Sequence, residues 1–164
     1  MSVMPAPTSQ PPLRPNGAER RFGGFHMSDP TPVTRPGPVM TPDTVFYWEG
    51  AARGELLAQQ CGGCGTLHHP PRPMCPRCGS TTRHAKKLSG RGVVYSWVVP
   101  RHPVLPIFAP DTVVALVELE EGIRIVSNIT DVPVSEMRNG IEVEVYFVPT
   151  AKGGAVPVFR PRSA

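Results

Sequence analysis

The chain has 164 residues, a formal net charge of +4, 22 prolines and only four cysteines. This length allows one ordinary domain together with a small additional unit. The N-terminus lacks the apolar core of a signal peptide, and no stretch approaches the roughly 18 to 20 apolar residues that cross a bilayer. These features exclude a membrane-spanning protein, and we expect a cytoplasmic protein with no membrane partner.

The first 41 residues are predicted to be a disordered tail. They contain nine of the 22 prolines, and their apolar residues show neither a two-residue nor a 3.6-residue period. Met27 is an alternative to Met1 as the start of the protein. We expect the ordered chain to begin at residue 42.

A short helix is predicted directly after the tail. The run Thr41–Thr44 offers a capping hydroxyl, a proline for the first turn and a carboxylate, and Gly54 supplies a left-handed cap at the other end. Three consecutive aromatic residues, Phe46, Tyr47 and Trp48, cannot all face the core of one short helix. They are therefore candidate anchors for a partner protein, and the alternative is that they close the gap between helix and barrel.

All four cysteines fall within one short window as two Cys-x-x-Cys pairs: Cys61, Cys64, Cys75 and Cys78. Each tight turn points two sulfurs at one centre, and a hairpin brings the second turn opposite the first. A glycine follows each pair, at Gly65 and Gly79, where a turn that donates backbone N–H groups to sulfur needs positive φ. The spacing predicts a closed structural zinc site.

Two other assignments of the cysteines were considered. A pair of disulfides requires an oxidising compartment, which the N-terminal sequence does not indicate. Iron suits four thiolates as well as zinc does, and the spacing alone does not separate the two metals. His68 and His69 are not expected to be ligands, because four cysteines already complete a tetrahedron.

Beyond a stiff, proline-rich loop at residues 68–74, the pattern changes to strands with a two-residue period. We predict a helix-plus-ribbon unit over residues 42–87 and a barrel over residues 88–164. The strands are expected at residues 91–99, 112–119, 123–129, 141–148 and 155–160, with one or two helical turns at 133–139. In the first strand, Val93, Tyr95 and Trp97 are expected to share one face. The fold class is mainly β, with a five-stranded OB-fold barrel.

A series of motifs in this order resembles a known family over residues 43–161. The series comprises Phe46–Trp48 and residues 61–65, 70–80, 89–96, 114–122 and 157–161. It is similar to acyl-CoA-associated proteins that join a rubredoxin-like zinc ribbon to an OB fold and serve as partners of thiolase-like enzymes. Residues 99–103 and 126–128 are most similar to the partner of the lipid-transfer-protein-type steroid side-chain aldolase.

Positive charge is concentrated in the middle of the chain, since no acidic residue occurs between Glu55 and Asp111. The candidate anion-contact residues in or beside this stretch are Arg72, Arg77, Lys86, Lys87, Arg91 and Arg101. A face of one sign favours a polyanion, either coenzyme A phosphates or nucleic acid. A third interpretation is that these charges are solvated or meet acidic groups of a partner.

The alternative function is that of a zinc-ribbon and OB-fold nucleic-acid-binding protein, with Tyr95 and Trp97 as stacking platforms. No RNA-binding signature accompanies these aromatics, so we expect no nucleic-acid partner. Independent catalysis is not expected either, because the cysteines are committed to metal and His102 lies in a proline-rich connector.

The resemblance implies an accessory, non-catalytic subunit in a hetero-oligomer with a thiolase-like enzyme or an aldolase. The complex would act on a CoA thioester, most concretely in the retro-aldol cleavage of a steroid side chain.

Overall fold

The computed structural model describes residues 35–103 and 108–163. Most of the predicted tail, and Met27 with it, lies outside the described residues. The described chain forms one helix, a three-stranded sheet and a closed barrel of five strands. None of the helices in these two ranges is long and apolar enough to cross a membrane.

Helix α1 (Val45–Ala52) begins slightly later than the sequence predicts. The carbonyl of Thr41 accepts hydrogen bonds from the N–H groups of Thr44 and Val45, so the Pro42 region forms a separate turn before the helix. Thr44 occupies the N-cap position without a side-chain cap. Gly54 has φ 77° and ends the helical segment in the predicted left-handed conformation.

The ribbon sheet contains strands β1 (Leu57–Cys61), β2 (Leu67–His68) and β3 (Arg83–Lys87), in the order β2-β1-β3 with antiparallel pairing. Strand β3 was not predicted, because its sequence Arg-His-Ala-Lys-Lys has no apolar alternation. Its side chains are mostly exposed. This strand forms through backbone pairing with β1, and such pairing does not require a hydrophobic pattern in the sequence.

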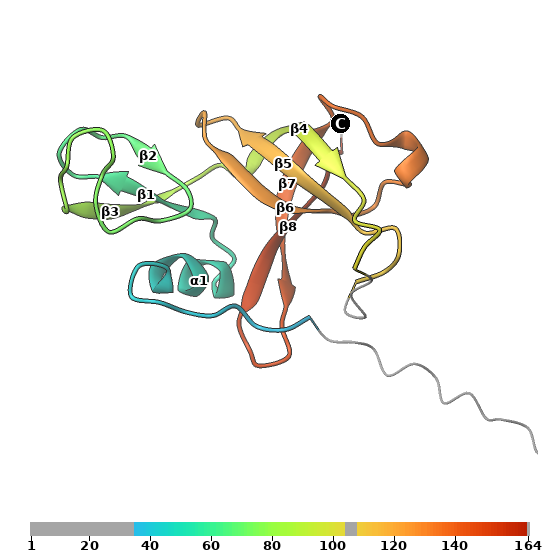
Figure 1. Ribbon diagram of the computed structural model, residues 1–164, viewed down its shortest axis with the longest axis horizontal. Coiled ribbons are helices and arrows are strands. Elements are labelled where there is room, and N and C mark those ends of the chain that lie inside the picture. The colour runs from blue at the N-terminus through green and yellow to red at the C-terminus, as the bar shows by residue number, and fades with distance from the viewer. Residues whose placement is uncertain (1–34, 104–107, 164) are drawn as a thin grey trace, which may run out of the picture. The chain divides into compact units, whose positions relative to one another are not determined.

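The barrel confirms the predicted five-stranded OB fold (Figure 1). Its strands are β4 (Arg91–Val98), β5 (Val113–Leu119), β6 (Arg124–Ile129), β7 (Glu142–Pro149) and β8 (Ala155–Pro161). The strands close in the order β4-β5-β6-β8-β7, and closure pairs the edges that an open sheet would expose. One turn of 3-10 helix, η1 (Val134–Glu136), connects β6 to β7 within the predicted helical segment.

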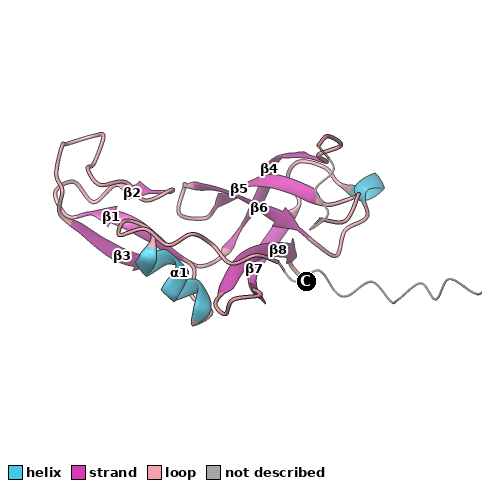
Figure 2. Cartoon of the chain, turned by 60° about the horizontal axis from the view of Figure 1, so that its bottom comes forward, coloured by secondary structure: helices cyan, strands magenta, loops and turns pink. Residues whose placement is uncertain are grey.

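One buried core joins the barrel to the helix and the ribbon. Alternate residues of β5 point inward, and Val117 and Phe159 are fully buried. Tyr47, Leu56 and Ala58 belong to the same buried cluster as these barrel residues. Helix α1 contacts β1, β7 and β8, and it lies beside the β7–β8 pair in Figure 2. The helix therefore packs on both the ribbon and the barrel.

A β-bulge in β4 changes the predicted face of its aromatics. The pairing with β5 shifts between Val94 and Ser96, which leaves Tyr95 in the irregular step. Val94 is buried and Tyr95 is exposed, whereas Trp97 is half-buried against the core. The prediction that Tyr95 and Trp97 share one face was therefore wrong, because one extra residue breaks the two-residue alternation.

Candidate metal centre and binding surfaces

The structure brings the four predicted cysteine sulfurs to one point. Their Sγ atoms all lie within 4.8 Å of one another. The Cys61–Cys78 and Cys64–Cys75 sulfur pairs are 3.5 Å and 3.7 Å apart. A tetrahedron with metal–sulfur bonds of about 2.3 Å has edges of about 3.8 Å, so these distances fit a four-thiolate metal site.

Two equivalent turns position the sulfurs. In the first turn, the Cys61 N–H donates to the carbonyl of Thr66, and the Gly65 N–H donates back to the carbonyl of Cys61. The second turn repeats both hydrogen bonds with Cys75, Ser80 and Gly79. Gly65 and Gly79 have φ of 71° and 73°, as the sequence predicts for these turns. The repeated geometry explains why each pair ends in glycine.

Local hydrogen bonds favour the thiolate form of the first cysteine pair. The backbone N–H groups of Cys64 and Gly63 lower the pKa of the Cys61 thiol. The hydrogen bond with the Thr66 hydroxyl lowers the pKa of Cys64 to about 6. The four cysteine sulfurs together form a donor set that suits a metal that binds thiolates. His68 is not in the sulfur cluster, but its Nε2 lies 3.3 Å from the Sγ of Cys75.

The aromatic triplet of α1 lies at the junction of helix, ribbon and barrel. Tyr47 is only 4% exposed, while Phe46 and Trp48 are half-buried against the core cluster. The Tyr47 ring meets Trp48 edge-on at 4.7 Å and lies 5.0 Å from the His69 ring. Tyr47 thus contributes to packing inside the chain. Contact of Phe46 and Trp48 with a partner stays a prediction.

Three of the six candidate anion-contact residues meet acidic groups within the chain. The pairs are Lys87–Glu55 at 3.1 Å, Arg91–Glu120 at 3.0 Å and Arg101–Asp111 at 3.3 Å. Arg83, in the same stretch, pairs with Asp43. Folding therefore brings acids from outside the stretch, or from its borders, against its cations. The positive charge of this stretch is therefore partly neutralised in the tertiary structure.

The other three candidates lie on the ribbon. Arg77 donates to the Thr66 hydroxyl at 3.2 Å, and within the described ranges no acidic group pairs with Arg72, Arg77 or Lys86. Arg72 lines a cleft of about 460 Å³ that also contains His68 and Arg124. Contact of Arg72, Arg77 and Lys86 with an anion stays a prediction. His102, considered above as a catalytic group, is exposed.

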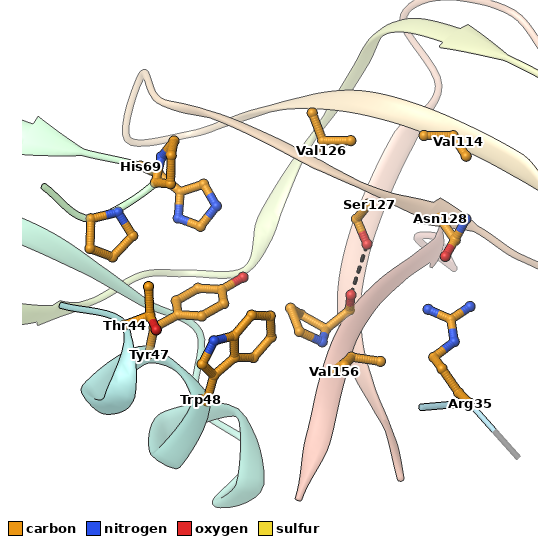
Figure 3. Close-up of a pocket in the computed structure, with 13 residues that line it drawn as sticks. Arg35, Thr44, Tyr47, Trp48, His69, Val114, Val126, Ser127, Asn128 and Val156 are labelled. Carbon is orange, nitrogen blue, oxygen red and sulfur yellow. Dashed lines mark hydrogen bonds between the residues drawn. The ribbon is translucent and has the colours of Figure 1, made fainter. Parts of the chain in front are cut away.

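A cavity of about 360 Å³ lies where α1, the loop at residues 69–71 and strands β5, β6 and β8 meet. In Figure 3, the Tyr47 hydroxyl, the His69 ring and the Trp48 indole face one space, with Asn128 and Arg35 at its other end. The Nδ1 atom of His69 is buried with no hydrogen-bond partner in the described chain. Desolvation lowers the pKa of His69 to about 4, so the ring is neutral at pH 7.

Sequence reasoning did not find this cavity. Its walls come from segments far apart in the chain, and no periodic pattern marks them. The one local signal was the aromatic triplet, for which packing between helix and barrel was considered as an alternative to partner contact.

Family models match both parts of the chain. The model described as "ChsH2, rubredoxin-like zinc ribbon domain" matches residues 48–82. The model described as "ChsH2, C-terminal OB-fold domain" matches residues 85–148. The two matches follow the order of the ribbon and the barrel in the structure, and the second match ends before strand β8.

Two curated relatives are subunits of hydratases. The probable enoyl-CoA hydratase alpha subunit of Thermomonospora curvata is 40% identical over 127 residues, which cover 77% of this chain and 40% of that protein. The 3-oxo-4,17-pregnadiene-20-carboxyl-CoA hydratase alpha subunit of Mycobacterium tuberculosis is 34% identical over 120 residues, covering 73% and 38%. The chain therefore spans about two fifths of the length of these relatives.

A solved structure matches about three quarters of the chain. It is entitled Ltp2-ChsH2(DUF35) aldolase, and the matching chain is 39% identical with a TM-score of 0.72. The match covers 76% of this protein and 98% of the solved chain. With the zinc-ribbon and OB-fold models in succession, this match shows that the protein belongs to the ChsH2-type DUF35 family.

Proposed function

We propose that this protein is an accessory, non-catalytic subunit of a thiolase-like enzyme that acts on acyl-CoA thioesters. The observation that carries the proposal is the match over 98% of one chain of the solved Ltp2-ChsH2(DUF35) aldolase. A chain that matches one component of a two-component enzyme over its full length is suited to the same structural role. Both curated hydratase relatives are also named as subunits.

The metal centre supports a structural role for the ribbon. Four cysteine sulfurs within 4.8 Å of one another complete a tetrahedron, so the site keeps no open position for water or substrate. We assign zinc to this site, because the matched family model is a zinc ribbon and four thiolates form a common structural zinc site. The bound metal would hold the two turns together and so fix the surface that the ribbon presents.

The substrate we propose for the complex is a steroid side-chain acyl-CoA that undergoes retro-aldol cleavage. Support comes from the names of two similar proteins, a hydratase subunit for a pregnadiene carboxyl-CoA and an aldolase. In this proposal the thiolase-like partner supplies the acid and base for carbon–carbon cleavage. Contact of Arg72, Arg77 and Lys86 with the CoA phosphates remains a secondary part of the proposal.

The test is to co-express the full chain with thiolase-superfamily proteins of the same genome and to isolate any complex by size exclusion. We expect a stoichiometric complex that cleaves an acyl-CoA carrying a β-hydroxy side chain, whereas neither protein alone does so. Elemental analysis of the freshly purified complex should show one zinc per copy of this chain. Robust cleavage by this chain alone, or failure of all these proteins to bind it, would contradict the proposal.

A further inference from the structure

Exposed apolar side chains gather on the outer surface of three barrel strands. Val98 is 59% exposed, Val126 is 67% exposed and Tyr95 is 46% exposed, although all three lie in or beside regular strands. The half-buried Val114 and Leu116 of β5 lie between them. We call this set of five residues the β4–β6 face. Surface patches of this kind are typical of interaction sites.

The strand register makes the β4–β6 face continuous. Val98 pairs with Val114, and Leu116 pairs with Val126, so apolar side chains stand next to one another across the strands. The inward residues between them, such as Ala115 and Val117, are buried in the barrel core. Along β5, the inward residues and the outward residues Val114 and Leu116 are therefore apolar, whereas the next outward residue, Glu118, pairs with Arg124.

The β4–β6 face runs directly into the cavity at the junction of helix, ribbon and barrel. Val114 and Val126 belong to both, while Trp48 and Tyr47 form the opposite wall. Figure 3 shows Val126 and Val114 along the upper side of this space and the two aromatic rings below. The arrangement is an apolar surface with a recess of about 360 Å³, large enough for one inserted side chain.

Positive charge in the recess indicates the chemistry of its occupant. Burial lowers the pKa of Arg35, and within the described residues its guanidinium forms no salt bridge. The Cζ atom of Arg35 lies 5.5 Å from the centre of the Phe108 ring. At the far edge of the face, Arg124 stacks on Tyr95 at 3.5 Å and already pairs with Glu118 at 3.6 Å. Since a covered cation needs a negative partner, a carboxylate is expected on the docking surface.

We propose that the β4–β6 face and its recess dock the thiolase-like subunit, which inserts an apolar side chain beside Trp48 and places a carboxylate against Arg35. This inference rests on the proposed function, and it adds the surface and the chemistry of the contact. In this arrangement the partner contacts the outer face of β5 and β6. The metal centre then supports the loop at residues 69–71 and is not itself part of the contact.

The first experiment replaces an exposed side chain whose loss should not affect folding. Val126→Glu in the full chain should weaken the affinity for the co-purified thiolase-like subunit at least tenfold, because an unpaired charge would be buried in an apolar contact. The matched control is Met74→Glu, which changes another exposed apolar residue, on the ribbon. It should bind within twofold of wild type, provided that its metal content is unchanged.

The second experiment tests the carboxylate. Arg35→Gln should lower the affinity about tenfold and make it less dependent on salt, whereas Arg138→Gln, a change at an exposed arginine after η1, should alter neither property. Wild-type binding of the partner by Val126→Glu and Arg35→Gln would overturn the docking inference and leave the proposed function standing. The inference would also be overturned if these two variants bound the partner normally but lost binding to an acyl-CoA or an oligonucleotide. That result would assign the surface to the other ligand. Failure of the wild-type chain to bind any thiolase-like protein would instead contradict the proposed function.

Discussion

At the scale of single residues, the fold keeps one histidine neutral. His69 lies against the Tyr47 ring, and its buried Nδ1 finds no partner in the described chain. On its other side it borders the cleft lined by Arg72, Arg124 and Glu118. Burial lowers the pKa of His69, because a charged imidazole would lose its hydration there.

This burial predicts a specific loss of stability in mild acid. The unfolded chain takes up a proton on His69 near pH 6.5, but the folded chain does so only near pH 4. Protonation between these values favours the unfolded state, so the free energy of unfolding falls as the pH is lowered through this window. Between pH 7 and pH 5 we expect wild type to lose about 2 kcal/mol more than the non-titrating variant His69→Gln.

Urea denaturation at several pH values measures this difference, with the metal content of both proteins checked at each pH. Parallel pH profiles for the two proteins would show that His69 is as well solvated in the folded chain as in the unfolded one.

At the scale of elements, the ribbon depends on two turns that require left-handed backbone. Gly65 has φ 71°, and a Cβ at this position would meet no atom within 4 Å. The effect of a side chain there is therefore confined to the backbone conformation. Because the same turn carries two predicted metal ligands, Cys61 and Cys64, backbone strain should appear directly in metal affinity.

Gly65→Ala should destabilise the folded, metal-bound turn by about 1 kcal/mol, which corresponds to roughly fivefold weaker zinc binding. Gly65→Asn should bind zinc more tightly than Gly65→Ala, since asparagine adopts the left-handed conformation at lower cost. Competition with a chromogenic chelator gives the three affinities. Equal affinities for alanine and glycine at this position would contradict the argument.

At the scale of the whole molecule, the shared core couples the ribbon to the barrel. Leu56 and Ala58 lie in the same buried cluster as Val117 and Phe159. We therefore expect the metal-bound protein to unfold in one transition. Removing the metal with a chelator at neutral pH should lower the Tm by about 10 °C or more, because the ligand that favours the folded ribbon is lost.

Differential scanning calorimetry with and without chelator tests this coupling, and re-addition of zinc should restore the original transition. An unchanged Tm in demonstrably metal-free protein would mean that the ribbon contributes nothing to the stability of the rest.

The pairing of charges across the molecule also argues against nucleic-acid binding. Lys87, Arg91 and Arg101 have acidic partners, and Tyr95 is already stacked against Arg124. We expect affinity for single-stranded oligonucleotides to be weaker than about 10 μM at physiological salt, as for nonspecific electrostatic binding. Fluorescence anisotropy over a salt series measures it. Submicromolar binding that is lost in Tyr95→Ala would support the nucleic-acid alternative instead.

The sequence by itself determined the features that depend on local chemistry. Two Cys-x-x-Cys pairs with trailing glycines specify two turns, and their sulfurs do converge in the structure. Alternation of apolar residues identifies the five barrel strands, because burial of one strand face imposes a two-residue period. Gly54 likewise marks the end of the helical segment through its own backbone freedom.

Only the tertiary structure decided the features that depend on distant partners. Strand β3 exists through pairing with β1, and the bulge at Tyr95 depends on the register with β5. The acid-free stretch loses much of its one-sign character because Asp43 and Glu120 reach its arginines from outside it. The recess beside Trp48 is assembled from several elements in the same way. The periodicity of apolar residues indicates which face of an element is buried. The contacts named here depend on which elements pack together, and only the folded chain determines that packing.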